Sequence, residues 1–330
     1  MTSMKLAMLS ALTTLAMALG TTCVQAAGFQ HGVAADPNGK PLVIGIWYPS
    51  QAPAKPMSMG PTTMSVALNG AIEGSALPLV VVSHGTGSSF LGHYDTAIAL
   101  ADAGHVVVAV THTGDHYADQ SRSVLIMDRP PQISRVIDHM LASWESRATI
   151  NPARIGMFGF SAGGFTTLVS IGGRPDSSRI GPTCREHPQD YACVLIAKSG
   201  KTDAVPSNPG SGQDPRIKAA VIAAPALGFT FSPEEMKNIT IPVQLWRAEN
   251  DVIQPHPRYA EAVRQALAKP PDYRVVNNAG HFDFLPPCTD ALANIAPVIC
   301  ISATGFDRAA FHQTFNASVV DFFGKHLSHH

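Results

Sequence analysis

RIGMFGFSAGGF, at residues 154–165, is the most informative stretch of the chain for its fold. Its apolar run Ile155–Phe158 leads into a Gly-x-Ser-x-Gly pattern centred on Ser161. Flanking glycines let the chain turn back sharply without a Cβ clash, as a tight strand-to-helix connection requires. The same turn is typical of a nucleophile elbow, which presents its serine to a substrate. The stretch therefore predicts a strand, a sharp turn at Ser161 and a helix over Ala162–Ile171.

Short apolar runs rich in β-branched residues alternate with helical patterns on both sides of this stretch. We expect strands at 28–33, 41–48, 79–82, 106–110, 155–158, 217–223, 241–246 and 273–276, and helices at 93–103, 133–144, 162–171, 258–267 and 308–326. Buried runs separated by helices are typical of a mostly parallel sheet that is covered on both faces. The sequence therefore predicts an α/β fold with a mostly parallel central sheet and helices on both faces.

Four segments do not fit the alternation. A Pro/Met/Gly-rich stretch at 49–61 is typical of a surface loop, and longer segments follow at 113–131, 172–215 and 286–305. Long irregular segments in a compact domain usually form lids or disulfide-tied loops. We therefore expect the three longer segments to form a cap over the site.

Size and charge narrow the class of protein. The chain has 330 residues, of which 45% are hydrophobic, and a formal net charge of −1. This length suffices for one large domain with a substantial core. The charge balance gives no reason to expect a nucleic-acid partner. No phosphate-binding loop or dinucleotide fingerprint is present in the sequence, so phosphoryl and hydride transfer lack support.

The first residues have the layout of a Sec-type signal peptide. Lys5 precedes an apolar run at 6–19, and Val-Gln-Ala-Ala follows at 24–27. A run of 14 apolar residues is short for a membrane span, so we expect no stable membrane insertion. We expect residues 1–27 to be a signal peptide, residues 28–330 to form a single catalytic domain, and the protein to be secreted or periplasmic.

The cysteines fit export. Loss of Cys23 with the signal peptide leaves Cys184, Cys193, Cys288 and Cys300, an even number for an oxidising compartment. Four cysteines allow three pairings, which the sequence does not distinguish. The simplest expectation is two local bridges, Cys184–Cys193 and Cys288–Cys300, each closing a loop that contains proline.

A serine nucleophile needs an adjacent base, and the base needs an acid to orient it. His281 directly follows the last expected strand, and Gly280 gives its loop freedom to aim the ring. Asp251 follows the strand that ends near Trp246 and precedes His281 by 30 residues. We therefore expect Ser161, Asp251 and His281 to be catalytic. Two further carboxylates remain alternatives for the acid, Glu249 and Asp283.

An oxyanion requires two N–H donors. We expect them from Ala162, after the nucleophile, and from Thr86 in the turn after the first core strand, with Gly87 as the alternative to Thr86. His84 in the same turn is a second candidate base, although a role in bracing the loop is the simpler interpretation.

Three neighbouring side chains, His112, Asp115 and His116, have a weak likeness to a metal site. Their spacing points to no particular metal, and the sequence suggests no further ligand. A loop that faces the active-site crevice explains them equally well. We expect neither a metal nor a cofactor.

Together these motifs resemble the α/β-hydrolases, and more narrowly the bacterial predicted dienelactone hydrolases related to platelet-activating-factor acetylhydrolase. The resemblance spans nearly the whole mature chain and rests on five motifs: WYPS at 47–50, SHGTG at 83–87, GFSAGG at 159–164, RAENDVIQPHPRY at 247–259 and NAGHFDFL at 278–285. Two departures matter. True dienelactone hydrolases use cysteine where this chain has Ser161, and the loop at 223–226, where the acetylhydrolases place their acid, carries no carboxylate.

These patterns lead to one expected function. We expect an exported serine hydrolase that cleaves carboxylic esters, small or polymeric, through an acyl-enzyme. Lactones, polyesters or phospholipid acyl groups are alternative substrates for the same triad. A noncatalytic binding protein of this fold is a further alternative. The oligomeric state is not predictable from the sequence.

Overall fold

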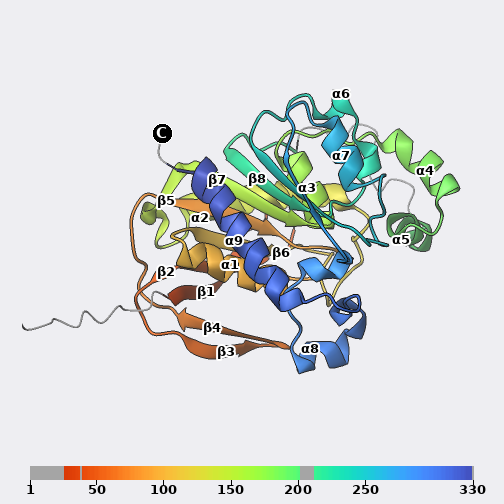
Figure 1. Cartoon of the computed structure of the whole chain (residues 1–330). Coiled ribbons are helices and arrows are strands. Elements are labelled where there is room, and N and C mark those ends of the chain that lie inside the picture. Colours follow the sequence, from red (N-terminus) through yellow and green to blue (C-terminus); the bar gives the residue numbers. More distant parts are fainter. Residues whose placement is uncertain (1–25, 38, 201–211, 329–330) are drawn as a thin grey trace, which may run out of the picture.

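A ten-stranded sheet forms the centre of the computed structural model, which describes residues 26–37, 39–200 and 212–328 (Figure 1). The strands are β1 (Ala26–Ala34), β2 (Leu42–Ser50), β3 (Lys55–Met59), β4 (Thr62–Leu68), β5 (Leu77–Ser83), β6 (Val106–Thr111), β7 (Ile150–Phe160), β8 (Ile217–Ala223), β9 (Val243–Ala248) and β10 (Asp272–Val276). The helices are α1 (Tyr94–Asp102), α2 (Arg129–Ala142), α3 (Ala162–Ser170), α4 (Ile180–Glu186), α5 (Tyr191–Ser199), α6 (Pro233–Met236), α7 (Ala260–Ala266), α8 (Asp290–Ile295) and α9 (Arg308–His326).

The sheet is parallel where the site lies. Its order is β10-β9-β8-β7-β5-β6-β2-β1-β4-β3, and every neighbouring pair from β10 to β6 is parallel. The strands β6, β2 and β1 pair antiparallel, so the first hairpin extends the sheet on one side. In an open parallel sheet, loops at the carboxyl ends of the strands gather along one edge, where ligands bind. The loops after β5, β7, β9 and β10 therefore lie along the same edge.

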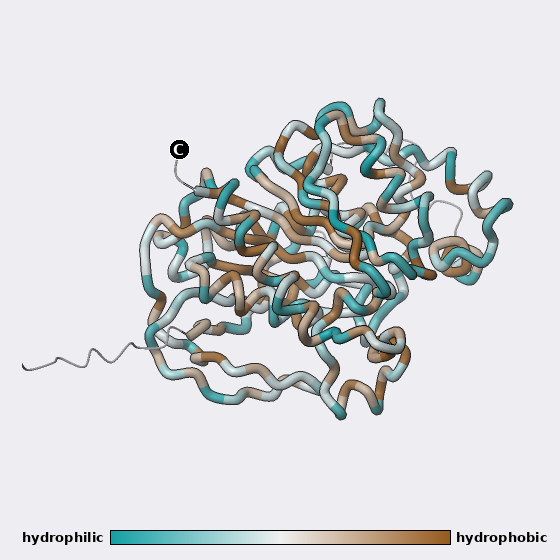
Figure 2. The backbone as a smooth tube through the Cα atoms, in the orientation of Figure 1, coloured by the Kyte–Doolittle hydropathy of each residue, from teal (hydrophilic) through white to brown (hydrophobic). Residues whose placement is uncertain are grey.

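Both faces of the central strands are buried, as an all-apolar run requires. Along β5, Leu79 and Val81 join one core cluster, whereas Val80 and Val82 join the other. Helices α2, α3 and α7 cover the first face, and α1 and α9 cover the second, where α9 crosses in front of the sheet (Figure 1). Figure 2 shows hydrophobic segments concentrated along these central strands. The predicted α/β architecture is confirmed.

Two of the sequence expectations for loops are wrong. The stretch at 49–61 is not a loop throughout, because β2 continues to Ser50 and β3 occupies Lys55–Met59. The strand β4 follows and pairs with both β3 and β1, so these residues extend the sheet at its edge. Burial that alternates from residue to residue is typical of a strand and is seen along β4. The strand β3 is mostly exposed at the edge of the sheet, and its pairing with β4 is what makes it a strand.

The long segments also contain short helices. Helices α4 and α5 lie within 172–215, α8 lies within 286–305, and α2 begins at Arg129, earlier than expected. No helix in the described ranges is long and apolar enough to cross a bilayer. The expected signal sequence lies outside the described residues up to position 25, and Ala26 and Ala27 begin β1.

Candidate active site

The turn between β7 and α3 is as sharp as the sequence predicts. Ser161 has φ 55° and ψ −116°, a conformation that residues with a side chain rarely adopt. A Cβ on Gly159 would lie 2.1 Å from the Gly163 carbonyl oxygen, and one on Gly163 would lie 1.9 Å from the Ser83 carbonyl oxygen. Larger residues at these two positions would therefore displace the backbone that holds Ser161 up.

The structure brings Ser161, His281 and Asp251 together in a chain of hydrogen bonds. The Nε2 atom of His281 lies 3.0 Å from the Ser161 Oγ, and Nδ1 lies 2.7 Å from the Asp251 Oδ2. All three residues are buried. The imidazole also lies against the Phe160 ring, with centroids 4.8 Å apart. A base that bridges a serine and a carboxylate is the arrangement that activates a nucleophilic hydroxyl.

Asp251 is held by its own loop. Its Oδ1 accepts the backbone N–H groups of Ile253 at 2.9 Å and Gln254 at 2.7 Å, which leaves Oδ2 for His281. No Lys or Arg among the described residues forms an ion pair with Asp251, so its negative charge is directed at the imidazole. Such a carboxylate fixes the tautomer of the ring and stabilises its protonated form.

The two alternative carboxylates brace the histidine loop instead. Glu249 Oε2 accepts the N–H of Asn278 at 2.8 Å, and Asp283 Oδ2 accepts the N–H of Gly280 at 2.7 Å. The other Asp283 oxygen pairs with Arg308 at 3.0 Å. Both carboxylates therefore position the turn that carries His281 without touching its ring nitrogens.

Two N–H groups near Ser161 have no acceptor among the described residues, those of Thr86 and Ala162. The alternative donor, Gly87, is already engaged, because its N–H donates to Asp115 Oδ1 at 3.0 Å. The free pair lies beside the serine, since Thr86, Ser161 and Ala162 line one small cavity. Two such donors can hold an oxyanion.

A buried ion pair fixes the loop that contains Thr86. Arg129 donates to Asp115 Oδ2 through Nη2 at 2.6 Å and through Nε at 3.1 Å, and these side chains are only 2% and 4% exposed. The third Arg129 nitrogen, Nη1, donates to the His84 carbonyl at 2.6 Å. Because Asp115 also binds Gly87, the pair holds the loop on both sides of Thr86.

The buried histidines here are structural. His84 binds the Gly85 carbonyl with Nδ1 at 2.6 Å and accepts the N–H of His112 with Nε2 at 3.0 Å. Burial, together with the positive charge of Arg129, holds the pKa of His84 well below its usual 6.5. Both ring nitrogens of His112 are also engaged, by Ser83 and Gln132. These contacts favour the bracing role for His84, and over the described ranges no group of three or more His, Cys, Asp or Glu side chains could hold a metal ion.

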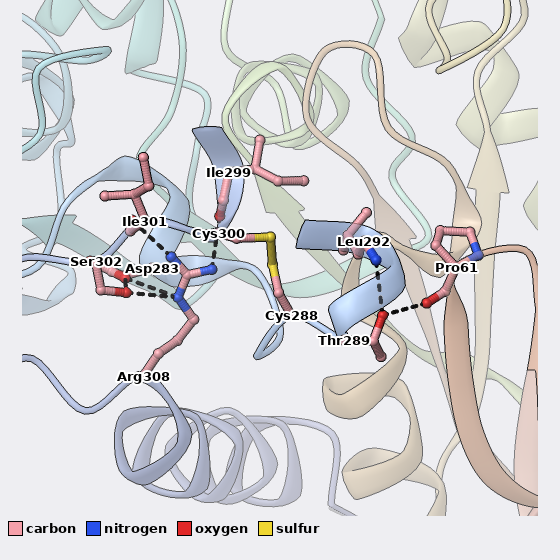
Figure 3. Close-up of a disulfide and its surroundings, with 10 residues drawn as sticks. All are labelled: Pro61, Asp283, Cys288, Thr289, Leu292, Ile299, Cys300, Ile301, Ser302 and Arg308. Carbon is pink, nitrogen blue, oxygen red and sulfur yellow. Dashed lines mark hydrogen bonds and ion pairs between the residues drawn. A yellow bond between two sulfur atoms is a disulfide. The ribbon is translucent and has the colours of Figure 1, made fainter. Parts of the chain in front are cut away.

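A wide cleft of about 1160 Å³ opens over Ser161 and His281. Its apolar walls come from the loop after β5, from the β3–β4 turn and from the segment 286–300. The last two walls meet where Thr289 Oγ1 donates to the Pro61 carbonyl at 2.6 Å (Figure 3). The cleft is therefore roomy and mostly apolar.

Both expected disulfides are present. Cys288 and Cys300 close the segment that forms one wall of the cleft, and Arg308 donates to the carbonyls of Ile299 and Ile301 beside the bridge (Figure 3). The other bridge, Cys184–Cys193, joins α4 to α5. Each bridge thus ties down an insertion that borders the site.

Sequence reasoning missed four residues that shape the site. These are Arg129, Arg308, Tyr191 and Gln254. Arg308 follows an Asp N-cap at the start of the last helix, and Arg129 begins α2, so neither carries a local signal of a buried ion pair. Their partners, Asp283 and Asp115, are distant in sequence by 25 and 14 residues.

Comparisons with known proteins address the fold. No protein-family model and no curated protein matches the chain. A solved structure of a ferulic acid esterase from Streptomyces cinnamoneus matches with a TM-score of 0.62 and 19% sequence identity, over 94% of this chain and 92% of that one. The narrower likeness to dienelactone hydrolases and acetylhydrolases stays a prediction. The chain therefore has the α/β-hydrolase fold that its motifs predict.

Proposed function

We propose that the protein is a serine hydrolase that cleaves carboxylic esters. The observation that carries the proposal is the pair of hydrogen bonds from His281 to Ser161 at 3.0 Å and to Asp251 at 2.7 Å, at the base of an apolar cleft. The similar structure of an enzyme described as a ferulic acid esterase adds support for ester chemistry.

The proposed reaction has two halves. Ser161 Oγ attacks the ester carbonyl while His281 Nε2 takes the hydroxyl proton, and the N–H groups of Thr86 and Ala162 hold the oxyanion. His281 then gives that proton to the leaving alkoxide, which departs as the alcohol and leaves an acyl-Ser161 ester. Water gives a proton to His281 and attacks the carbonyl of this ester. His281 then returns that proton to Ser161 Oγ as the bond between this oxygen and the acyl carbon breaks, which releases the acid and restores the serine. Asp251 stabilises the imidazolium in both halves.

We further propose that the enzyme acts outside the cytoplasm. The signal-like layout at 1–27 and the two disulfides support export, since such bridges persist in oxidising compartments. The substrate would then be an extracellular or periplasmic ester, small or polymeric.

A fluorophosphonate probe tests the chemistry directly, because it labels an activated serine. We expect labelling of the wild type and of Ser58→Ala, an exposed change on the edge strand β3, and none of Ser161→Ala. Asp251→Asn should fold but label slowly, because the imidazole loses its negative partner. Equal labelling of Ser161→Ala and the wild type would exclude the proposed nucleophile.

A further inference from the structure

A second, smaller cavity lies beside Ser161. Its volume is about 40 Å³, and Thr86, Ser161 and Ala162 line it together with apolar side chains from three other segments: Val124, Ile126, Leu195, Ile196 and Leu227. On this measure one water needs ~10–15 Å³, so the pocket accepts roughly three heavy atoms beyond the reacting carbonyl.

The two cavities divide an ester into its two parts, provided that the proposed ester hydrolysis is correct. His281 must protonate the leaving alcohol, and His281 lines the wide cleft. The alcohol part therefore lies in the wide cleft. The acyl chain lies on the side of Ala162, in the small pocket, where the carbonyl oxygen meets the two N–H donors.

Gln254 gives the small pocket a polar end. The residue is only 3% exposed and lines this pocket, yet its Oε1 has no hydrogen-bond partner in the described part of the chain. A buried carbonyl oxygen without a donor is unfavourable, so a ligand that supplies the donor gains affinity relative to one that does not. None of the described residues that line the pocket is Lys, Arg or His, so a carboxylate on the acyl chain would find no counter-charge.

We propose that Gln254 selects acyl groups of short hydroxy acids, whose hydroxyl binds the Gln254 amide while the alcohol part occupies the wide cleft. A hydroxyl both donates and accepts, so it suits the oxygen or the nitrogen of the amide. Two substrates share this chemistry. One is a simple ester of a short hydroxy acid, and the other is the hydroxyl end of a linear oligoester, whose remaining units extend along the wide cleft.

The side chain of Gln254 can be changed without touching the triad's supports. The bond to Asp251 Oδ1 uses the backbone N–H of Gln254, at 2.7 Å, so Gln254→Met keeps that bond and the approximate length of the side chain. Gln265→Met is the matched control, because Gln265 is an exposed residue of α7.

The experiment compares benzyl esters in pairs that differ only in the hydroxyl: propanoate with 2-hydroxypropanoate, and butanoate with 3-hydroxybutanoate. We expect kcat/KM to favour at least one hydroxyacyl ester about tenfold in the wild type and in Gln265→Met, as one neutral hydrogen bond allows. In Gln254→Met the ratio should fall to about one. A ratio of one in the wild type, or an unchanged ratio in Gln254→Met, overturns the proposal.

Other measurements keep the outcome clear. If Gln254→Met does not fold, the acyl-chain preference of the wild type can be compared with that of Leu195→Ala, in which the small pocket is larger. Activity should peak at about two to four acyl carbons in the wild type and shift to longer acyl chains in the variant. Equal activity on octanoate and propanoate esters would overturn the proposal. Loss of all ester turnover together with absent fluorophosphonate labelling would instead refute the proposed function.

Linear oligomers of 3-hydroxybutanoate distinguish the two possible substrates, a simple ester of a hydroxy acid and the hydroxyl end of an oligoester. If the oligoester is the source, oligomers with a free hydroxyl end release monomer faster than oligomers capped there by acetyl. If only the benzyl hydroxyacyl esters show the preference, the proposal holds for simple esters. Equal cleavage of capped and free oligomers at their ends, with no preference among benzyl esters, overturns it.

Discussion

Removing the carboxylate of the Asp115–Arg129 pair should destabilise the fold sharply. In Asp115→Leu the Arg129 guanidinium, 2% exposed, would stay buried without its counter-charge. Breaking a buried pair from one side typically costs about 3–5 kcal/mol of unfolding free energy. Removing both charges leaves no buried ion, so Asp115→Leu/Arg129→Met should be at least about 2 kcal/mol more stable than the single variant.

Activity should not recover in the double variant as stability does. Both variants lose the Asp115 bond to the Gly87 N–H, at 3.0 Å, and with it one anchor of the loop that places the Thr86 N–H. Loss of an oxyanion donor lowers kcat by about 10²–10³-fold. A loosened donor should cost less, about tenfold in the single variant. The loss should be at least as large in the double variant, which also lacks the Arg129 bond to the His84 carbonyl.

Urea unfolding and kcat on a soluble ester measure the two effects separately. Asp128→Leu is the control, because its pair with Arg122 is exposed, at 35% and 50%, and should contribute less than about 1 kcal/mol. A double variant no more stable than Asp115→Leu would refute the unpaired-charge argument. A kcat equal to that of the wild type would refute the proposed role of the pair in placing Thr86.

Three further predictions use other parts of the molecule. Burial lowers the pKa of His93 from 6.5 to about 3, so between these pH values the unfolded chain binds a proton that the folded chain does not. The free energy of unfolding therefore falls as the pH drops below 6.5. Between pH 7 and pH 5, urea unfolding should show the wild type losing about 2 kcal/mol more of this free energy than His93→Phe. Equal losses in the two proteins would contradict this prediction. Gly163→Ala should lose most activity and roughly 1–3 kcal/mol of stability, because its Cβ would meet a strand carbonyl at 1.9 Å, whereas Gly324→Ala, with no atom within 4 Å, should unfold at equal or higher urea. Mass mapping without reduction should find Cys288 joined to Cys300. Replacing both with serine should cost about 3 kcal/mol of unfolding free energy for a loop of this length, and should lower kcat/KM mainly for esters with bulky alcohols, since that loop lines the wide cleft. Free thiols, or an equal loss of kcat/KM on small esters, would count against this assignment.

Local patterns were enough for most of the central fold. The strand at 217–223 and the helix at 308–326 have the bounds that the sequence predicts, because their periodicity depends only on neighbouring residues. The turn at Ser161 was equally predictable, since Gly159 and Gly163 are required by contacts within the turn and with the adjacent strand β5. At the edge of the sheet, prediction from local patterns failed. The strand β3 forms because β4 pairs with it, whereas its own composition is that of a loop.

The sequence alone could not decide which carboxylate pairs with His281. Three carboxylates, Glu249, Asp251 and Asp283, stand in plausible loop positions. Only the geometry separates them, because β9 and β10 are neighbours in the sheet and bring the Asp251 oxygen within 2.7 Å of the imidazole. The other two carboxylates bind backbone N–H groups of the same loop.

The sequence by itself determined the order of the central strands and of the helices α1, α2, α3, α7 and α9, the sharp turn at Ser161 and the small set of candidate partners, since these depend on local backbone sterics and on the burial period. Only the tertiary structure decided that Arg129 neutralises Asp115, that Asp283 braces the histidine turn and that Gln254 faces the pocket beside Ser161. The first and the last of these join residues that are far apart in the chain, and Asp283 is set in place by Arg308, 25 residues away. They arise from which strand ends lie side by side and from the direction in which each buried side chain must point to satisfy its charge or hydrogen bond.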